Sequence, residues 1–68
     1  MTAQEWIERF AAELGHDPPS QEEVDTLLEL AATAAHSSER TAAPVACWVA
    51  GQAGVSPRAA REIAERIG

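Results

Sequence analysis

The sequence predicts an all-α protein, a compact bundle of four short helices. Three observations lead to this prediction: apolar residues recur at helical spacing, Ser or Thr precedes each such stretch, and glycine or proline separates the stretches. No stretch has the alternating pattern of a half-buried strand. The chain has 68 residues, 46% hydrophobic and 24% charged, which is typical of a folded domain with one hydrophobic core. We therefore expect residues 1–68 to form a single small helical domain.

The first helix is predicted over about residues 3–14. Thr2 and Glu5 have the spacing of a capping box, in which the hydroxyl and the carboxylate accept hydrogen bonds from backbone N–H groups at the helix start. Gly15 favours the left-handed backbone that ends a helix. Large apolar side chains form one stripe of this helix: Trp6, Ile7, Phe10 and Leu14.

A loop and a second helix follow. Pro18 and Pro19 predict the loop, because proline lacks a backbone N–H group and disfavours helical geometry in the residue before it. Ser20 and Glu23 repeat the capping-box spacing and predict a second helix over about residues 21–36. Its inward face is expected to comprise Val24, Leu27, Leu28, Ala31 and Ala35.

Two further helices complete the predicted bundle. The third covers about residues 42–53, with Thr41 as its cap and Gly54 as its end. The residues that share its main face are Val45, Trp48, Val49 and Gln52. Ser56 followed by proline predicts the fourth helix over about residues 57–67. The residues expected to point inward from it are Ala60, Ile63, Ala64 and Ile67.

The net charge of −6 is unevenly distributed along the chain. Residues 1–39 hold nine acidic residues and one arginine, whereas residues 40–68 hold four arginines and two glutamates. Such polarity can orient a partner, or it can simply keep a small protein in solution. Cys47 is the only cysteine, which excludes an internal disulfide, and no apolar run reaches the length of a membrane span. We expect a cytoplasmic protein with no membrane contact.

Chemistry-bearing motifs are absent from the sequence. The two histidines are twenty residues apart, and neither they nor Cys47 have metal-ligand spacing, so we expect no metal site. No strand precedes the glycines, as a phosphate-binding loop would require. Ser37 and Ser38 follow His36 at a helix end, where no fixed geometry or orienting acid makes a nucleophile. We therefore expect neither catalysis nor a bound cofactor.

Leu27 to Val49 reads LLELAATAAHSSERTAAPVACWV. An aliphatic helix ends there in Ala35-His36, and Arg40 precedes an Ala-Ala-Pro helix start that ends at Pro44. This segment, together with Trp6 and a Leu-Gly pair, resembles a small actinobacterial helical domain of unknown function. The chain departs from that pattern after the arginine, where proline is common, and in the third helix, which is less rich in large aliphatic residues.

The resemblance implies an accessory role in the synthesis of molybdenum cofactor (molybdopterin guanine dinucleotide). Domains of that family stand alone or at the end of a molybdenum cofactor guanylyltransferase, so the implied partner is that enzyme. The position of the motif places the expected contact surface at His36, Arg40, Pro44 and Trp48. A surface role without a partner is also open, because His36 suits a helix C-terminus and Arg40 could pair with a neighbouring acid.

Two alternatives compete with this interpretation. Val49 to Ile63 reads VAGQAGVSPRAAREI and resembles the helix-turn-helix of repressors of the lactose-repressor type, so residues 49–67 could bind DNA. The arginines that would contact DNA are Arg58, Arg61 and Arg66. The net charge of −6 and the absence of lysine argue against nucleic acid as a partner. A simple oligomerisation module is the third class, since Trp6 and Trp48 are large for so small a core.

Overall fold

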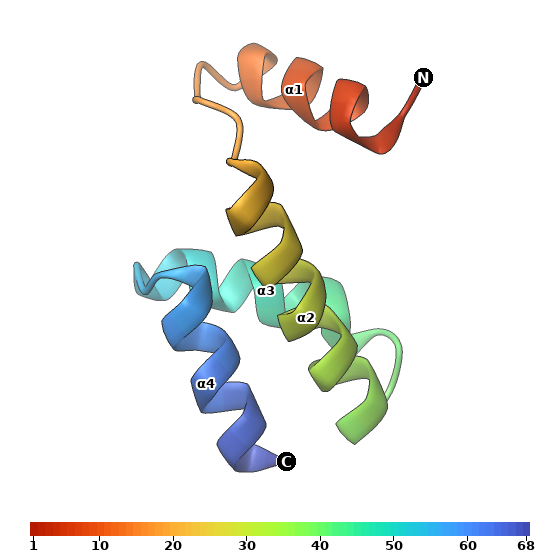
Figure 1. Ribbon diagram of the computed structural model, residues 1–68, viewed down its shortest axis with the longest axis vertical. Coiled ribbons are helices and arrows are strands. Elements are labelled where there is room, and N and C mark those ends of the chain that lie inside the picture. Colours follow the sequence, from red (N-terminus) through yellow and green to blue (C-terminus); the bar gives the residue numbers. More distant parts are fainter.

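The computed structural model describes all residues from Met1 to Gly68 and consists of four α-helices with no strand (Figure 1). The helices are α1 (Ala3–Glu13), α2 (Gln21–Ser37), α3 (Ala42–Ala53) and α4 (Pro57–Ile67). The predicted all-α fold with four helices is confirmed. Every helix begins at the predicted residue, and α1 and α2 end within one residue of the predicted position. None of the helices is long and apolar enough to cross a membrane.

Side-chain caps explain where three of the helices begin. At α1 the Thr2 backbone N–H donates to Glu5 Oε1 over 2.8 Å, and the Glu5 N–H donates back to Thr2 Oγ1 over 3.1 Å. The hydrogen bond from the Thr2 backbone to the Glu5 carboxylate, followed by the interaction with the Thr2 side chain, lowers the pKa of Glu5 below its ordinary value. Ser20 and Glu23 form the same pair of bonds at α2, and the Ser56 hydroxyl accepts a bond from the first turn of α4. Both predicted capping boxes are confirmed.

The predicted cap of α3 is wrong. Thr41 has a helical backbone and its side chain makes no capping hydrogen bond. The amides that a cap would satisfy are already bonded, because Ala42 N–H donates to the Glu39 carbonyl over 2.9 Å and Ala43 N–H donates to the Arg40 carbonyl over 3.1 Å. A backbone turn therefore starts α3 in place of a side chain. At the other end Gly54, with φ of 73°, ends the helix as predicted.

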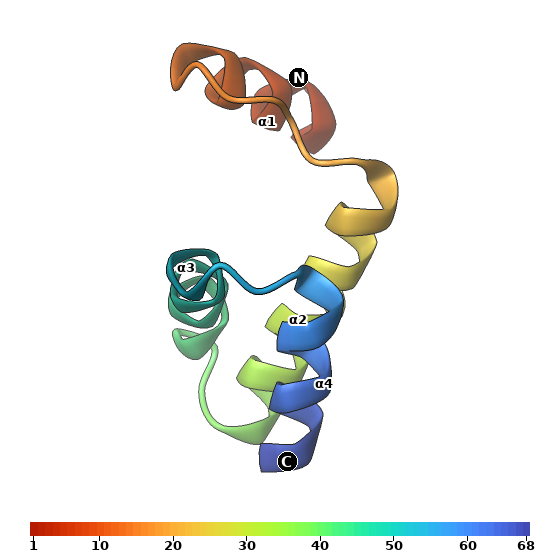
Figure 2. The same ribbon diagram turned by 90° about the vertical axis from the view of Figure 1, so that its left-hand side faces the viewer.

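Helix α2 is the centre of the structure. Both α3 and α4 pack against it, whereas α3 and α4 make little contact with each other. Helix α1 stands across the N-terminal end of α2, away from the other two (Figures 1 and 2). The most buried side chain is Leu30 in the middle of α2, which is 3% exposed and was missing from the predicted inward face. Leu28 was predicted to face inward but is 63% exposed, because α3 and α4 both lie on other sides of α2.

In α3 the half-buried side consists of small residues and not of the large apolar ones. The half-buried side of α3 consists of Ala42, Ala43, Ala46, Cys47 and Ala50. The predicted main face of α3 is exposed over its full length: Val45, Trp48, Val49 and Gln52. Alanine lets two helices approach closely, and a larger side chain in the same place would hold them apart. The prediction for α3 was wrong because it assigned the core to the largest apolar residues.

In α1 and α4, too, small residues are buried where large apolar residues were predicted to be. Ala60 is buried and Ala64 half-buried in α4, whereas the predicted inward residues Ile63 and Ile67 are largely exposed. In α1 the buried side is made by Ala11 and the half-buried Ile7. The rest of its predicted stripe is exposed: Trp6, Phe10 and Leu14. Much of the apolar surface of the chain therefore faces outward.

Replacing Leu30 by alanine should lower the free energy of unfolding by about 2–4 kcal/mol, because the side chain is buried where α2 meets its neighbours. Leu28→Ala, two residues away and exposed, is the matched control and should change it by less than about 0.5 kcal/mol. Urea denaturation followed by circular dichroism measures both values. Equal losses for the two variants would contradict the assignment of Leu30 as the centre of the core.

Ser20→Ala should lower the melting temperature by roughly 4–8 °C, since loss of a helix cap costs about 1 kcal/mol and α2 supports the whole fold. Thr2→Ala removes the equivalent cap from α1, which packs little on the other helices, so it should leave the melting temperature nearly unchanged. Thermal denaturation compares the two variants directly. A larger effect at Thr2 would mean that α1 is part of the cooperative core.

Candidate functional site

An apolar groove runs between α3 and α4. It exists because both helices pack on α2 but scarcely on each other. Leu30 forms its floor and Val55 closes one end, and ten residues line it without a single charged or polar side chain. The larger side chains on its walls are Val49 from α3 and Ile63 and Ile67 from α4, all substantially exposed. We call this feature the α3–α4 groove.

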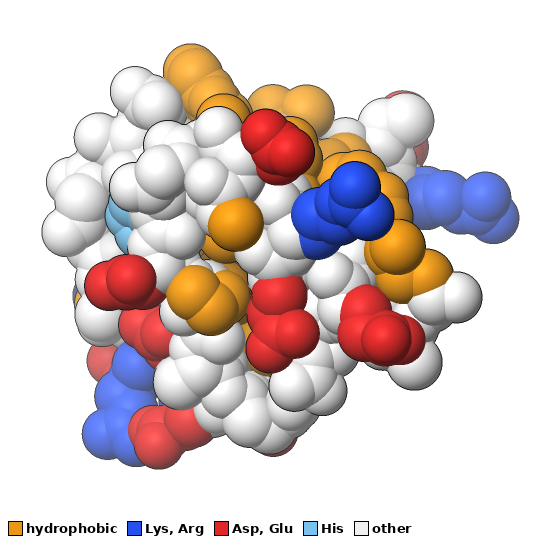
Figure 3. All heavy atoms as spheres, turned by 90° about the horizontal axis from the view of Figure 1, so that it is seen from above, with side chains coloured by type: hydrophobic (Ala, Val, Ile, Leu, Met, Phe, Trp, Pro, Cys, Tyr) orange, Lys and Arg blue, Asp and Glu red, His pale blue; other side chains and the backbone are white.

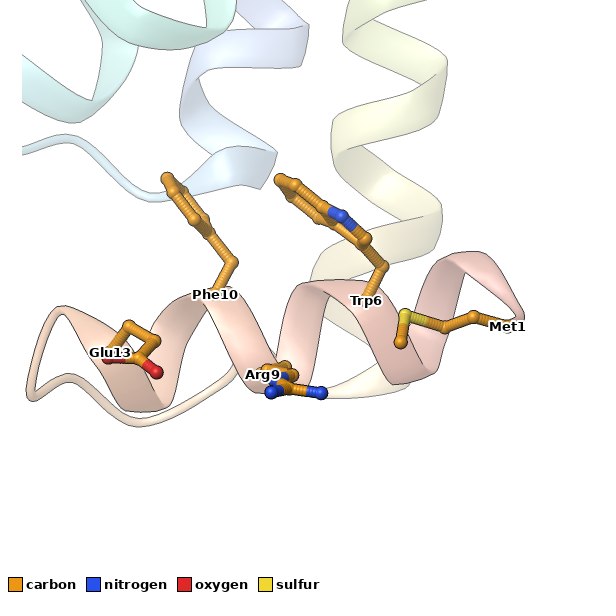
Figure 4. A pocket seen from close by; sticks show the side chains of 5 residues that line it. All are labelled: Met1, Trp6, Arg9, Phe10 and Glu13. Carbon is orange, nitrogen blue, oxygen red and sulfur yellow. The ribbon is translucent and has the colours of Figure 1, made fainter.

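A ridge of large apolar side chains projects from α1. Its members recur every four residues: Trp6, Phe10 and Leu14. The Trp6 and Phe10 rings stack with centroids 5.1 Å apart and an angle of 21° between their planes. Both rings remain about half exposed, at 55% and 51%. Figure 4 shows both rings pointing from α1 toward the side on which α2 and the start of α4 lie, with Met1, Arg9 and Glu13 placed around the same helix. We call Trp6, Phe10 and Leu14 the α1 ridge.

The predicted contact residues all lie at the surface. His36 is in the last turn of α2 and Arg40 in the turn before α3, and neither side chain makes a hydrogen bond or ion pair within the chain. Pro44 and Trp48 lie one helical turn apart on the outward side of α3, and Trp48 is 66% exposed. Together with Val45 they form what we call the α3 outer face. His36 and Arg40 lie in and next to the turn between α2 and α3, and no hydrogen bond or ion pair joins them to Pro44 or Trp48.

A profile of a domain of unknown function (DUF6457) matches residues 1–68. The chain belongs to the DUF6457 family. No curated protein and no solved structure matches it. The resemblance to a small helical domain of unknown function is thus confirmed, whereas the link to molybdenum cofactor synthesis stays a prediction.

Cys47 is the only nucleophilic sulfur in the DUF6457 domain, and it lies half-buried on the side of α3 that meets α2. Burial raises the pKa of its thiol, which disfavours the reactive thiolate. No group of three His, Cys, Asp or Glu side chains is placed to hold a metal ion. Eleven large apolar side chains are exposed on the DUF6457 surface. Seen from the α1 end, the surface shows apolar patches among acidic and basic side chains (Figure 3).

The arginines of the helix-turn-helix alternative are differently placed. Arg61 Nη1 donates to Glu29 Oε2 of α2 over 2.8 Å, and this bond raises the pKa of Arg61. Its Nε lies 3.4 Å from Glu65, so two carboxylates surround a side chain that would have to contact bases. Arg58 lies 4.0 Å from Glu22, also in α2. Only Arg66 has no acidic partner within the domain. Carboxylates beside these arginines would repel DNA phosphates.

Sequence reasoning missed both the α3–α4 groove and the Glu29–Arg61 ion pair. The groove had a signature in the sequence, since Ala46, Ala50, Ala60 and Ala64 have the four-residue spacing of a contact made by small residues. The ion pair joins residues 32 positions apart, and its existence depends on how α2 and α4 cross. Only the tertiary structure supplies that information.

A gel-shift assay with duplex DNA at low salt should show no retardation by the DUF6457 domain. The reason is the net charge of −6 and the engagement of Arg61 by Glu29. A salt-sensitive shift that Arg58→Ala and Arg61→Ala abolish, but that Arg9→Ala on α1 leaves intact, would contradict this expectation. It would establish the helix-turn-helix interpretation instead.

Proposed function

We propose that this DUF6457 domain is a non-enzymatic accessory domain that binds a protein partner, the molybdenum cofactor guanylyltransferase. The observation that carries the proposal is the position of Trp48, which is 66% exposed on the α3 outer face. The resemblance of residues 27–49 to domains found with that enzyme supports the choice of partner. Contact then runs through the α3 outer face and the turn that precedes it.

The residue types on this surface suit a protein interface. Tryptophan and arginine are the side chains most often found to dominate binding energy, because they bury a large area and make specific contacts. Arg40 precedes α3 and Trp48 lies in the middle of that helix, and Val45 adds a further exposed apolar side chain between them in the sequence. Covering Trp48 on binding would remove apolar surface that the isolated domain leaves in water.

The charges near the turn indicate the chemistry of the partner's surface. Arg40 makes no ion pair, not even with the adjacent Glu39, and His36 carries no side-chain hydrogen bond. An acidic side chain or a phosphate group on the partner could form charge-assisted hydrogen bonds with both side chains. The shallow hollow beside Val45 is not the place for such a group, because Glu39 lines it and neither His36 nor Arg40 does.

The proposal excludes a catalytic role, and the composition of the surface supports that exclusion. The α3–α4 groove has no acid, base or nucleophile in its lining, and the thiol of Cys47 faces α2. General acid–base catalysis needs a titratable side chain at the substrate, and nucleophilic catalysis needs a nucleophile activated by a nearby base; the groove lining offers neither.

Trp48→Ala should weaken binding to the guanylyltransferase by roughly thirtyfold or more, and Arg40→Ala by roughly tenfold. Both side chains are exposed, so neither change should alter the melting temperature by more than a few degrees. Titration of the labelled domain with the enzyme, followed by NMR, measures affinity and maps the surface. The shifted amides should cluster between Ala35 and Trp48.

Arg58→Ala, an exposed arginine on α4, is the matched control and should bind as the unchanged domain does. Unaltered affinity in the Arg40 variant would remove Arg40 from the surface. An absence of any shift at high enzyme concentration would refute the proposed partner.

A further inference from the structure

The domain exposes more surface than a chain of its mass requires. Its accessible area is 5290 Å², whereas a folded monomer of 7.2 kDa exposes about 4100 Å². The radius of gyration, 12.2 Å, likewise exceeds the value of about 11 Å for 68 residues. The excess area, about 1200 Å², is larger than the roughly 800 Å² that each partner contributes to a standard interface. Association with another molecule would therefore return the area to the ordinary range.

The shape and lining of the α3–α4 groove identify the kind of occupant. Two helix flanks form its walls and a third helix its floor, and its lining is apolar throughout. Such grooves bind an amphipathic helix through large apolar side chains that recur every three or four residues. The space of about 360 Å³ is sufficient for large side chains of this kind.

The α1 ridge has this spacing. Trp6, Phe10 and Leu14 are successive i and i+4 neighbours on one side of a helix. Phe10 and Leu14 border the same hollow as Ile7 and Ala11, but all three ridge side chains remain at least half exposed. Helix α1 can therefore keep its own contacts while the ridge enters a groove on another molecule.

Charge favours the meeting of these two surfaces. Helix α1 carries three glutamates and one arginine, whereas α4, which forms one wall of the groove, carries three arginines and two glutamates. Arg66 has no acidic partner and lies one turn from Ile63 in the groove wall. Glu29 and Glu65 engage Arg61 and Glu22 lies near Arg58, so the positive charge that an acidic helix meets along α4 is that of Arg66.

We propose that the occupant is a second copy of this chain, with the α1 ridge of each molecule seated in the α3–α4 groove of the other. The two contacts are equivalent, so the dimer is closed and two-fold symmetric. The ridge does not fill the groove of its own molecule. Phe10 and Leu14 border a hollow that touches α4 only at Pro57, whereas the groove extends along α4 to Ile67. Each α1 then serves as the fourth helix of its partner's core.

Sedimentation velocity over a wide range of concentrations tests the dimer and its geometry. The unchanged chain should show a concentration-dependent dimer. Phe10→Asp in the ridge and Ile63→Asp in the groove place a charge at half-exposed positions, so each should fold but weaken dimerisation by roughly a hundredfold. Trp48→Ala, which changes neither surface, should dimerise normally. Circular dichroism confirms folding, and Phe10→Ala with Ile63→Ala replaces any aspartate variant that unfolds.

An equimolar mixture of Phe10→Asp and Ile63→Asp supplies the decisive outcome. One chain retains an intact groove and the other an intact ridge, so one of the two contacts re-forms and the mixture dimerises although each variant alone does not. A monomeric unchanged chain at millimolar concentration would overturn the proposal. So would a mixture that stays monomeric, or a dimer that Phe10→Asp breaks and Ile63→Asp leaves intact. Each result is independent of the guanylyltransferase, whose binding depends on Trp48 and not on Phe10.

Discussion

The packing of α3 and α4 on α2 through small side chains is the constraint on which the rest of the structure depends. Ala46, Ala50, Ala60 and Ala64 bring the helix backbones close together, with Leu30 between them. The larger apolar residues of the same helices are consequently displaced to the outside. The α3–α4 groove and the α3 outer face both follow from this arrangement, and so does the surface available for partners.

The sequence predicts the local structure well because local structure depends on near neighbours. Thr2 with Glu5 and Ser20 with Glu23 are pairs three residues apart whose hydrogen bonds form wherever a helix starts. Gly54 ends α3 for an equally local reason, its positive φ. Thr41 is the exception, because a turn of the preceding backbone satisfies the amides that its hydroxyl would have capped.

The choice of buried face could not be predicted in the same way. Periodicity shows that a helix has an apolar side, but in α3 both small and large apolar residues recur at helical spacing, and size alone pointed to the wrong set. His36, Arg40, Pro44 and Trp48 were placed by a sequence motif, and all four are exposed as a contact surface requires. The spacing of the alanines in α3 and α4 marks the sides that line the α3–α4 groove, but the groove itself arises because both helices pack on α2 and scarcely on each other.

The burial of small side chains and the exposure of large ones can be measured most directly in a dilute solution of the domain, by the attenuation of side-chain NMR signals with a soluble paramagnetic agent. The structure predicts strong attenuation at the Trp48 indole and at the Val49 and Ile67 methyls, with protection of Leu30 and Ala60. Protection of Trp48 and Val49 together with exposure of Ala60 would contradict it, because large side chains would then hold the helices together.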